Sequence, residues 1–99
     1  MKLVLAEPAR RQAVAIESWW AENRPSAPIL FAREFRDTLE YIRRNPGVGT
    51  SWPTPRRPDL RRVLMPRTKR HVYFRVDVSK KVVQVLAVWG APRGQGPRL

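Results

Sequence analysis

Cysteine is absent from this 99-residue chain, and histidine occurs once, at His71. Without thiolates neither a disulfide nor a cysteine-ligated zinc site can form, so we expect no metal and no cofactor. Long apolar runs are also missing, since no stretch approaches the roughly 20 residues of a membrane-spanning helix. The opening MKLVLAEPARR meets charge and proline too early for a signal peptide. These absences predict a soluble, cytoplasmic protein without a membrane partner.

Acidic residues are scarce, and the basic ones are unevenly distributed. The chain has 20 lysines and arginines against 8 acidic residues, a net charge of +12. Residues 1–50 carry a net charge of +2 and residues 51–99 a net charge of +10. An arginine-rich coding bias would raise the total but would not concentrate it in one half. A field of this sign attracts nucleic acid or an acidic protein segment, so we expect the second half to hold the binding surface.

The first half has the spacing of a strand followed by two helices. The composition is 42% apolar, and the length fits a single domain over residues 1–99. Residues 3–6 form a short apolar run that predicts a strand. Apolar residues then recur at helical spacing in two stretches, Ala9, Ala13, Ile16 and Trp20, then Phe31, Phe35, Leu39 and Ile42. Because the break between these stretches is short, the two helices are expected to pack as an antiparallel hairpin.

The second half has the pattern of three strands. Residues 46–59 hold four of the ten prolines and predict a loop, and strands are expected at 60–66, 70–77 and 82–89. The middle strand alternates, with Val72, Phe74 and Val76 on one face and His71, Tyr73 and Arg75 on the other. The nearly continuous apolar run at 82–89 is typical of a central strand covered on both faces. Residues 90–99 are expected to be a flexible basic tail.

The order β-α-α-β-β-β predicts an α+β fold. We expect an antiparallel sheet with the helix hairpin on one face and the other face open. The first strand must join this sheet non-locally, because both helices separate it from the remaining strands. His71, Tyr73 and Arg75 would then line the open face.

Four segments together resemble one protein family. They are WWAENRPSAP, the NPGVG that ends the second helix, RRPDLRRVLMPRTKRHVYFRVD, and the closing VVQVLAVWGAPRG. In this order and spacing they resemble the RelE/ParE superfamily of toxins from bacterial type II toxin–antitoxin modules, and the ParE-like members more closely. The resemblance implies a growth-inhibiting toxin neutralised by a cognate antitoxin, whose acidic segment covers the basic surface. It also implies that operator DNA is bound only through the antitoxin complex.

The family uses two mechanisms on one fold, and fold alone does not choose between them. RelE-like members cut mRNA on the ribosome, whereas ParE-like members inhibit DNA gyrase. The resemblance places His71 where RelE-like enzymes have an arginine, and the other catalytic candidates of an RNase would be Lys69, Arg67 and Arg93. Arginines remain protonated and are poor bases, and no aromatic residue follows in the tail. His71 has two open interpretations, a catalytic acid or base and a strand residue that packs or hydrogen-bonds.

Basic residues of the second half are the expected contacts for an acidic antitoxin segment or for phosphate. With one tyrosine they are Arg56, Arg57, Arg61, Arg62, Arg70, Tyr73 and Arg75. A ParE-like gyrase inhibitor is the first hypothesis, and a RelE-like mRNA endoribonuclease is the second. The third is a basic nucleic-acid-binding module without enzymatic activity, although Tyr73 is the only aromatic residue expected to be exposed on the open sheet face.

Overall fold

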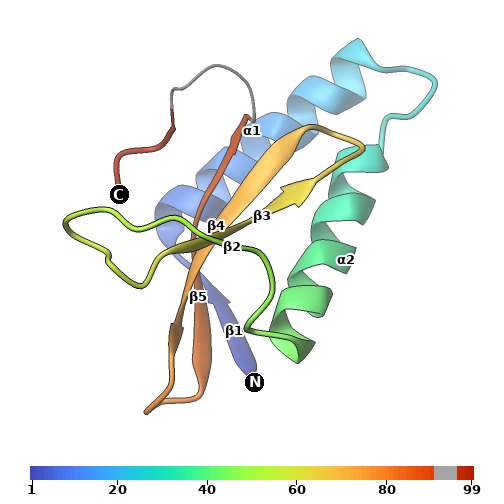
Figure 1. The fold of residues 1–99 in the computed structure, drawn as a ribbon. Coiled ribbons are helices and arrows are strands. Elements are labelled where there is room, and N and C mark those ends of the chain that lie inside the picture. The colour runs from blue at the N-terminus through green and yellow to red at the C-terminus, as the bar shows by residue number, and fades with distance from the viewer. Residues whose placement is uncertain (91–95) are drawn as a thin grey trace.

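The computed structural model describes residues 1–90 and 96–99, and its elements follow the predicted order with one additional strand. They are β1 (Lys2–Leu5), α1 (Glu7–Asn23), α2 (Leu30–Arg44), β2 (Thr50–Ser51), β3 (Arg61–Met65), β4 (Arg70–Asp77) and β5 (Val82–Gly90). In Figure 1, α1 crosses behind the strands and α2 descends beside them. This arrangement confirms the α+β class. No helix in the described part of the chain is long and apolar enough to cross a bilayer.

The five strands form one mixed sheet in the order β1-β5-β4-β3-β2. The prediction of an antiparallel sheet is confirmed for β5, β4, β3 and β2. It is wrong for β1, which pairs in parallel with β5, from Lys2 opposite Val82 to Leu5 opposite Val85. Parallel neighbours need a long crossover, and here both helices and three strands lie between β1 and β5. The short β2 lies in a segment expected to be loop and pairs with Arg61 and Arg62 of β3.

The main core lies between the helices and the sheet. Its fully or nearly buried residues are Ala9, Trp20, Phe31, Ile42, Met65, Val72, Phe74, Val83, Val85 and Val88. The predicted helical faces and the inward set of β4 are therefore confirmed. Burial of these apolar side chains away from water is the main force that holds the two layers together.

The prediction that the other face of the sheet is open is wrong at its centre. On this second face, opposite the helices, Tyr73 is only 3% exposed and joins Leu60, Leu86 and Ala87 in a smaller apolar cluster. Leu99 packs against the same cluster, and its carbonyl accepts a 2.9 Å hydrogen bond from Thr54 Oγ1. Within the predicted tail, residues 90–99, Gly90 is thus the last residue of β5 and Leu99 covers the smaller cluster. A strand packed on both faces must be apolar on both, as the run at 82–89 predicted.

A β-bulge in β5 changes which side chains reach the second face. Tyr73 lies opposite Ala87, but the next residue, Phe74, lies opposite Val85, so Leu86 is the extra residue. Leu86 and Ala87 therefore both belong to the second-face cluster, and the alternation restarts with Val88 in the main core. The residue after Val88 is Trp89, which returns to the second face. Unbroken alternation from Val83 would have turned Trp89 toward the helices.

Candidate functional site

His71 lies in a row of three side chains that crosses the second face. It is directly opposite Leu64 of β3 and Trp89 of β5. Leu64 is 46% exposed and Trp89 37% exposed, so both ends of this 64–71–89 row meet solvent. The imidazole lies 6.0 Å from the ring of Tyr73. The bulge at Leu86 makes this row possible, because it brings Trp89 to the same face as His71.

The surroundings of His71 favour its neutral form. Burial, and then the positive charge of Arg62, lower the pKa of His71 below its ordinary value. Its Nδ1 atom is buried and has no hydrogen-bond partner among residues 1–90 and 96–99. Within this part of the chain, no carboxylate or carbonyl therefore fixes the tautomer through Nδ1, as the orienting residue of a catalytic histidine does.

Arg62 is held between aromatic side chains of the second face. Its guanidinium carbon lies 3.4 Å from the centroid of the Trp52 ring, and its Nη1 donates to the Tyr73 hydroxyl at 3.3 Å. The backbone N–H of Trp52 donates to the carbonyl of Leu60 at 2.8 Å, which extends the pairing of β2 with the β3 side. Trp52 is nonetheless 44% exposed. The indole therefore fixes the arginine and leaves part of its own ring to solvent.

Arg61, expected to contact an antitoxin or phosphate, is occupied by a loop of its own chain. Its Nε donates to the carbonyl of Val48 at 3.0 Å, and its Nη2 donates to the carbonyls of Gly47 and Gly49 at 2.9 and 3.0 Å. Gly49 has φ of +83°, which a residue with a side chain rarely adopts. Arg61 therefore organises the NPGVG turn that follows α2.

Arg75 and Arg70 are likewise engaged within the chain. Arg75 forms an ion pair with Asp59 at 2.9 Å and donates to Gln84 Oε1 at 2.8 Å. Arg70 donates to the carbonyl of Thr68 at 3.0 Å, and burial lowers its pKa. Both positions thus support the sheet and its β3–β4 turn.

The remaining candidates lie on loops. Arg67 and Lys69 are exposed in the β3–β4 turn, where Lys69 has φ of +58°, and Arg56 is exposed in the loop before β3. Arg57 is half-buried and lines a cavity of about 330 Å³ together with Trp89 and Gln12. The structure therefore does not bring Lys69, Arg67 and His71 together through any hydrogen bond among the described residues. Arg93 lies outside those residues.

Glu34 is a residue that the sequence did not single out, and it fastens the β3–β4 turn to α2. Its carboxylate accepts hydrogen bonds from the backbone N–H groups of Arg67 and Thr68, both at 2.9 Å, and from Thr68 Oγ1 at 2.7 Å. Thr68 is only 2% exposed. The spacing of residues in the sequence does not indicate this role of Glu34, because two of its donors are backbone groups more than 30 residues away in the chain.

A groove of about 780 Å³ runs between α2 and β3. Its lining includes the exposed apolar side chains of Ile29, Tyr41 and Leu64. The charged residues beside it are two basic and two acidic ones: Arg33, Arg67, Glu34 and Asp37. Because β2 pairs only with the first two residues of β3, no described strand pairs with the edge of β3 from Val63 onward. An unpaired edge beside an apolar groove can accept a further strand.

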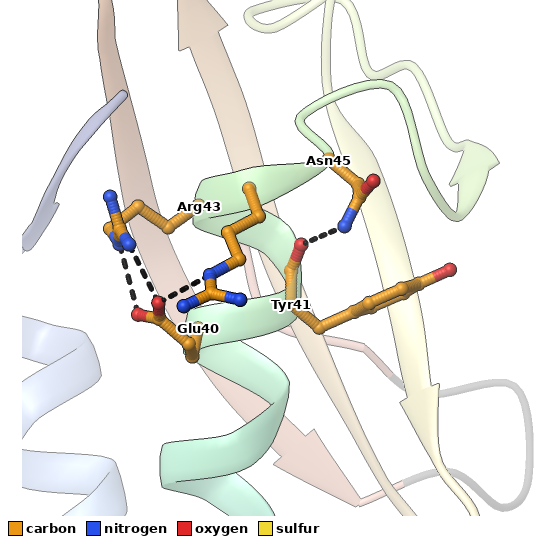
Figure 2. A network of polar contacts seen from close by, with 5 residues as sticks. Glu40, Tyr41, Arg43 and Asn45 are labelled. Atoms are coloured by element: carbon orange, nitrogen blue, oxygen red, sulfur yellow. Dashed lines mark hydrogen bonds and ion pairs between the residues drawn. The ribbon is translucent and has the colours of Figure 1, made fainter.

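Figure 2 shows a separate ionic network at the end of α2, with the Tyr41 ring directed away from it. Arg43 donates to both oxygens of Glu40 at 2.6 and 2.9 Å, and Arg44 Nε donates at 2.9 Å. The hydrogen bond from Arg43, aided by Arg44 and opposed by desolvation, lowers the pKa of Glu40 to about 2. The Asn45 side chain donates to the Tyr41 carbonyl at 3.1 Å and closes the helix. This network satisfies both arginines without involving the second face.

A metal centre has no obvious ligands in residues 1–90 and 96–99, where no three His, Asp or Glu side chains gather. What the second face offers instead is exposed indole rings, a fixed guanidinium and a neutral imidazole. Such groups can bind a ligand by stacking and charge. In the described part of the chain, they include no carboxylate that could serve as a general base beside His71.

No family model and no curated protein matches the chain. Solved structures do match. A chain of the chromosomal ParDE TA system from P. aeruginosa is 21% identical, with a TM-score of 0.68 over 93% of this chain and 97% of that one. A chain of the intact E. coli RelBE toxin–antitoxin complex is 17% identical, with a TM-score of 0.60 over 93% and 98%.

The YoeB/ParE toxin from Agrobacterium tumefaciens is 15% identical, with a TM-score of 0.58 over 91% of this chain and 98% of that one. At these identities the likeness concerns the fold. It extends over almost the whole chain in all three comparisons, as the sequence resemblance predicted. The chain therefore has the fold of the RelE/ParE toxins.

Proposed function

We propose that this protein is the toxin of a bacterial type II toxin–antitoxin system, held inactive by direct binding of its antitoxin. The observation that carries the proposal is the unpaired edge of β3 beside the α2–β3 groove. A toxin that must be neutralised by a protein needs such a surface, and proteins normally protect an edge of this kind. The fold likeness to chains of two toxin–antitoxin systems supports the same conclusion.

The antitoxin segment that fits this surface is extended and apolar on one side. Its backbone would add a strand to β3, and alternate side chains would contact Ile29, Tyr41 and Leu64. Arg33 and Arg67 line the groove together with Glu34 and Asp37, so charged groups of both signs are available to polar residues of the segment. Arg61 is no longer an expected antitoxin contact, because its side-chain N–H groups already donate to the carbonyls of residues 47–49.

For the target we propose DNA gyrase, inhibited by binding and without covalent chemistry by the toxin. Cleavage of RNA would need a base for the 2′-hydroxyl and an acid for the leaving oxygen. Among the residues that the structure describes, His71 has no orienting partner at Nδ1, and Arg70 and Arg75 are engaged within the chain. These features support a binding surface more than a nuclease site.

Expression from a tightly controlled promoter tests both parts. We expect growth arrest with induction of the SOS response and gyrase-trapped DNA breaks, while transcripts stay intact. Co-expression of a short acidic protein encoded next to the gene should restore growth. Tyr41→Asp should abolish this rescue and leave the arrest, whereas Val78→Asp, on the exposed β4–β5 turn, should change neither.

The outcomes separate the alternatives. Decay of mRNA within minutes, abolished by His71→Ala in a folded protein, would replace gyrase inhibition with the endoribonuclease function. Arrest that no adjacent acidic protein relieves would contradict the proposed antitoxin control. Normal growth at high expression would refute the toxin function itself.

A further inference from the structure

We propose that two copies of this chain associate through the edge of β1, as antiparallel neighbouring strands with Val4 at the two-fold axis. This interface goes beyond the proposed toxin function and does not depend on it. β1 is the terminal strand of the sheet, and no described strand lies on its other side. Because β3 and β2 lie at the opposite end of the sheet, the α2–β3 groove would remain accessible in such a dimer.

The hydrogen bonds between β1 and the β5 segment indicate which backbone groups of β1 remain available. The N–H groups of Lys2 and Ala6 donate to carbonyls on the β5 side, at 3.2 and 2.8 Å. Successive residues of a strand direct their backbone groups to opposite sides, so those of Leu3 and Leu5 point away from β5. No described strand pairs with them, and they can therefore accept a further strand.

The side chains along this edge are apolar. Leu3 and Leu5 are half-buried against the main core, and Val4, which alternation places on the second face, is 37% exposed. Leu3 also lines a groove of about 590 Å³ together with Phe35 and Leu39 of α2. Proteins usually protect a sheet edge with proline, a bulge or a charge, and none of these occurs between Leu3 and Leu5.

A second β1 matches this edge when the two Val4 residues lie opposite each other. Leu3 of each copy then lies opposite Leu5 of the other, and each of these pairs exchanges both N–H···O=C bonds. The leucine pairs lie on the helix side, beside the groove, while the two Val4 side chains meet on the second face. A shift by one residue would direct the available groups of one strand at groups already bonded to β5. The edge is thus complementary to itself, as a two-fold symmetric interface requires.

The charges at the two ends of β1 favour the same register. Lys2 lies opposite Ala6 of the second copy, and Glu7 of that copy follows directly. The ammonium group of each chain therefore lies near a carboxylate of the other. Within its own chain Glu7 contacts Arg11 at 3.7 Å in an exposed pair, and such a pair contributes little to stability. The Glu7 carboxylate is therefore available to the second copy.

Disulfide cross-linking tests this register directly, because the chain has no cysteine of its own. Val4→Cys would place two thiols across the axis in a pair whose Cα atoms lie about 4.5 Å apart, a separation that a disulfide can join. The matched control is Lys2→Cys, whose thiol would lie opposite Ala6 and away from its counterpart. In a glutathione redox buffer we expect Val4→Cys to form the covalent dimer at least about tenfold faster. Equal rates for the two variants would overturn the proposal.

Sedimentation equilibrium of the unmodified chain measures the association itself. We expect the mean mass to rise with concentration from 11.5 kDa toward twice that value, with a Kd in the micromolar range because the interface is small. Val4→Lys sets like charges against each other at the axis and should raise the Kd about tenfold. The matched control, Val14→Lys on α1, changes a residue 58% exposed and should leave the Kd within about twofold.

Three results of the sedimentation experiments would overturn the proposal. The first is a chain that remains monomeric at millimolar concentration, and the second is an equal effect of Val4→Lys and Val14→Lys. The third is a dimer that Tyr41→Asp abolishes and Val4→Lys preserves, because the second copy would then lie in the α2–β3 groove. Where Val4→Lys does not fold, the rates of the two cysteine variants decide.

Discussion

Replacing Glu34 with alanine should detach the β3–β4 turn from α2 and destabilise the whole domain. The carboxylate accepts three hydrogen bonds, two from backbone N–H groups of the turn and one from Thr68 Oγ1. Thr68 is 2% exposed, so its hydroxyl has almost no access to water as a substitute acceptor. A buried donor left without an acceptor is destabilising by the full cost of its desolvation.

The expected magnitude follows from these bonds. Hydrogen bonds to charged groups contribute about 1.5–3 kcal/mol each, and because the three share one carboxylate they are not additive. We therefore expect Glu34→Ala to reduce the free energy of unfolding by about 3 kcal/mol. In a domain of this size that is a decrease in Tm of about 12–24 °C. Thr68→Val alone should remove about 1–2 kcal/mol and should add little in the Glu34→Ala background.

Urea denaturation followed by circular dichroism measures each value, and Glu40→Ala is the matched control. Glu40 lies on the same helix and also accepts three hydrogen bonds, but all come from exposed arginine side chains. Its removal should leave the denaturation midpoint nearly unchanged, because exposed ion pairs contribute little. Equal effects of Glu34→Ala and Glu40→Ala, or simple additivity of Glu34→Ala and Thr68→Val, would refute the reasoning.

Three further predictions concern a titration, a turn and the bulge. The pKa of His71 is lower in the folded chain than in the unfolded one, so its protonation opposes folding. The free energy of unfolding should therefore fall as the pH decreases from about 6.5 through the folded pKa. His71→Gln should flatten this part of the pH profile, as measured by urea titrations. Gly49→Ala should cost about 2–4 kcal/mol through its positive φ and the overlap of the new methyl group with Arg62, whereas Gly47→Ala, in open space, should be tolerated. Gln12→Leu removes the oxygen that accepts the Val88 N–H at 2.9 Å, so amide exchange at Val88 should accelerate at least tenfold, while Gln12→Glu should preserve its protection.

The sequence predicted the elements well because each one depends on local periodicity. Both helices, β1 and the three main strands were expected within a few residues of their observed bounds, since apolar spacing of 3.6 or 2 identifies the face that must be buried. The inward set of Val72, Phe74 and Val76 was predicted for the same reason. The direction of β1 was not, because a long connection allows either orientation.

The candidate site was less predictable, because its geometry depends on pairings between distant residues. The types and number of basic residues could be read from the sequence, but not that Arg61 would serve the turn at 47–49 while Arg62 would lie on Trp52. Tyr73 was expected at an exposed position and is buried instead, because Leu60 and Leu99 cover it. No sequence pattern indicates the role of Glu34, since two of its donors are backbone N–H groups, which do not depend on residue type.

The sequence by itself determined the fold class, the strong positive charge of the second half and the central, doubly covered position of the last strand. Each of these is a property of composition or of local spacing, and neither depends on tertiary contacts. Only the tertiary structure decided which side chains reach each face of the sheet. One extra residue in β5, Leu86, reverses the alternation and turns Trp89 toward His71. A bulge forms where the packing of both faces and the pairing with β4 are satisfied together, and no local pattern contains that information.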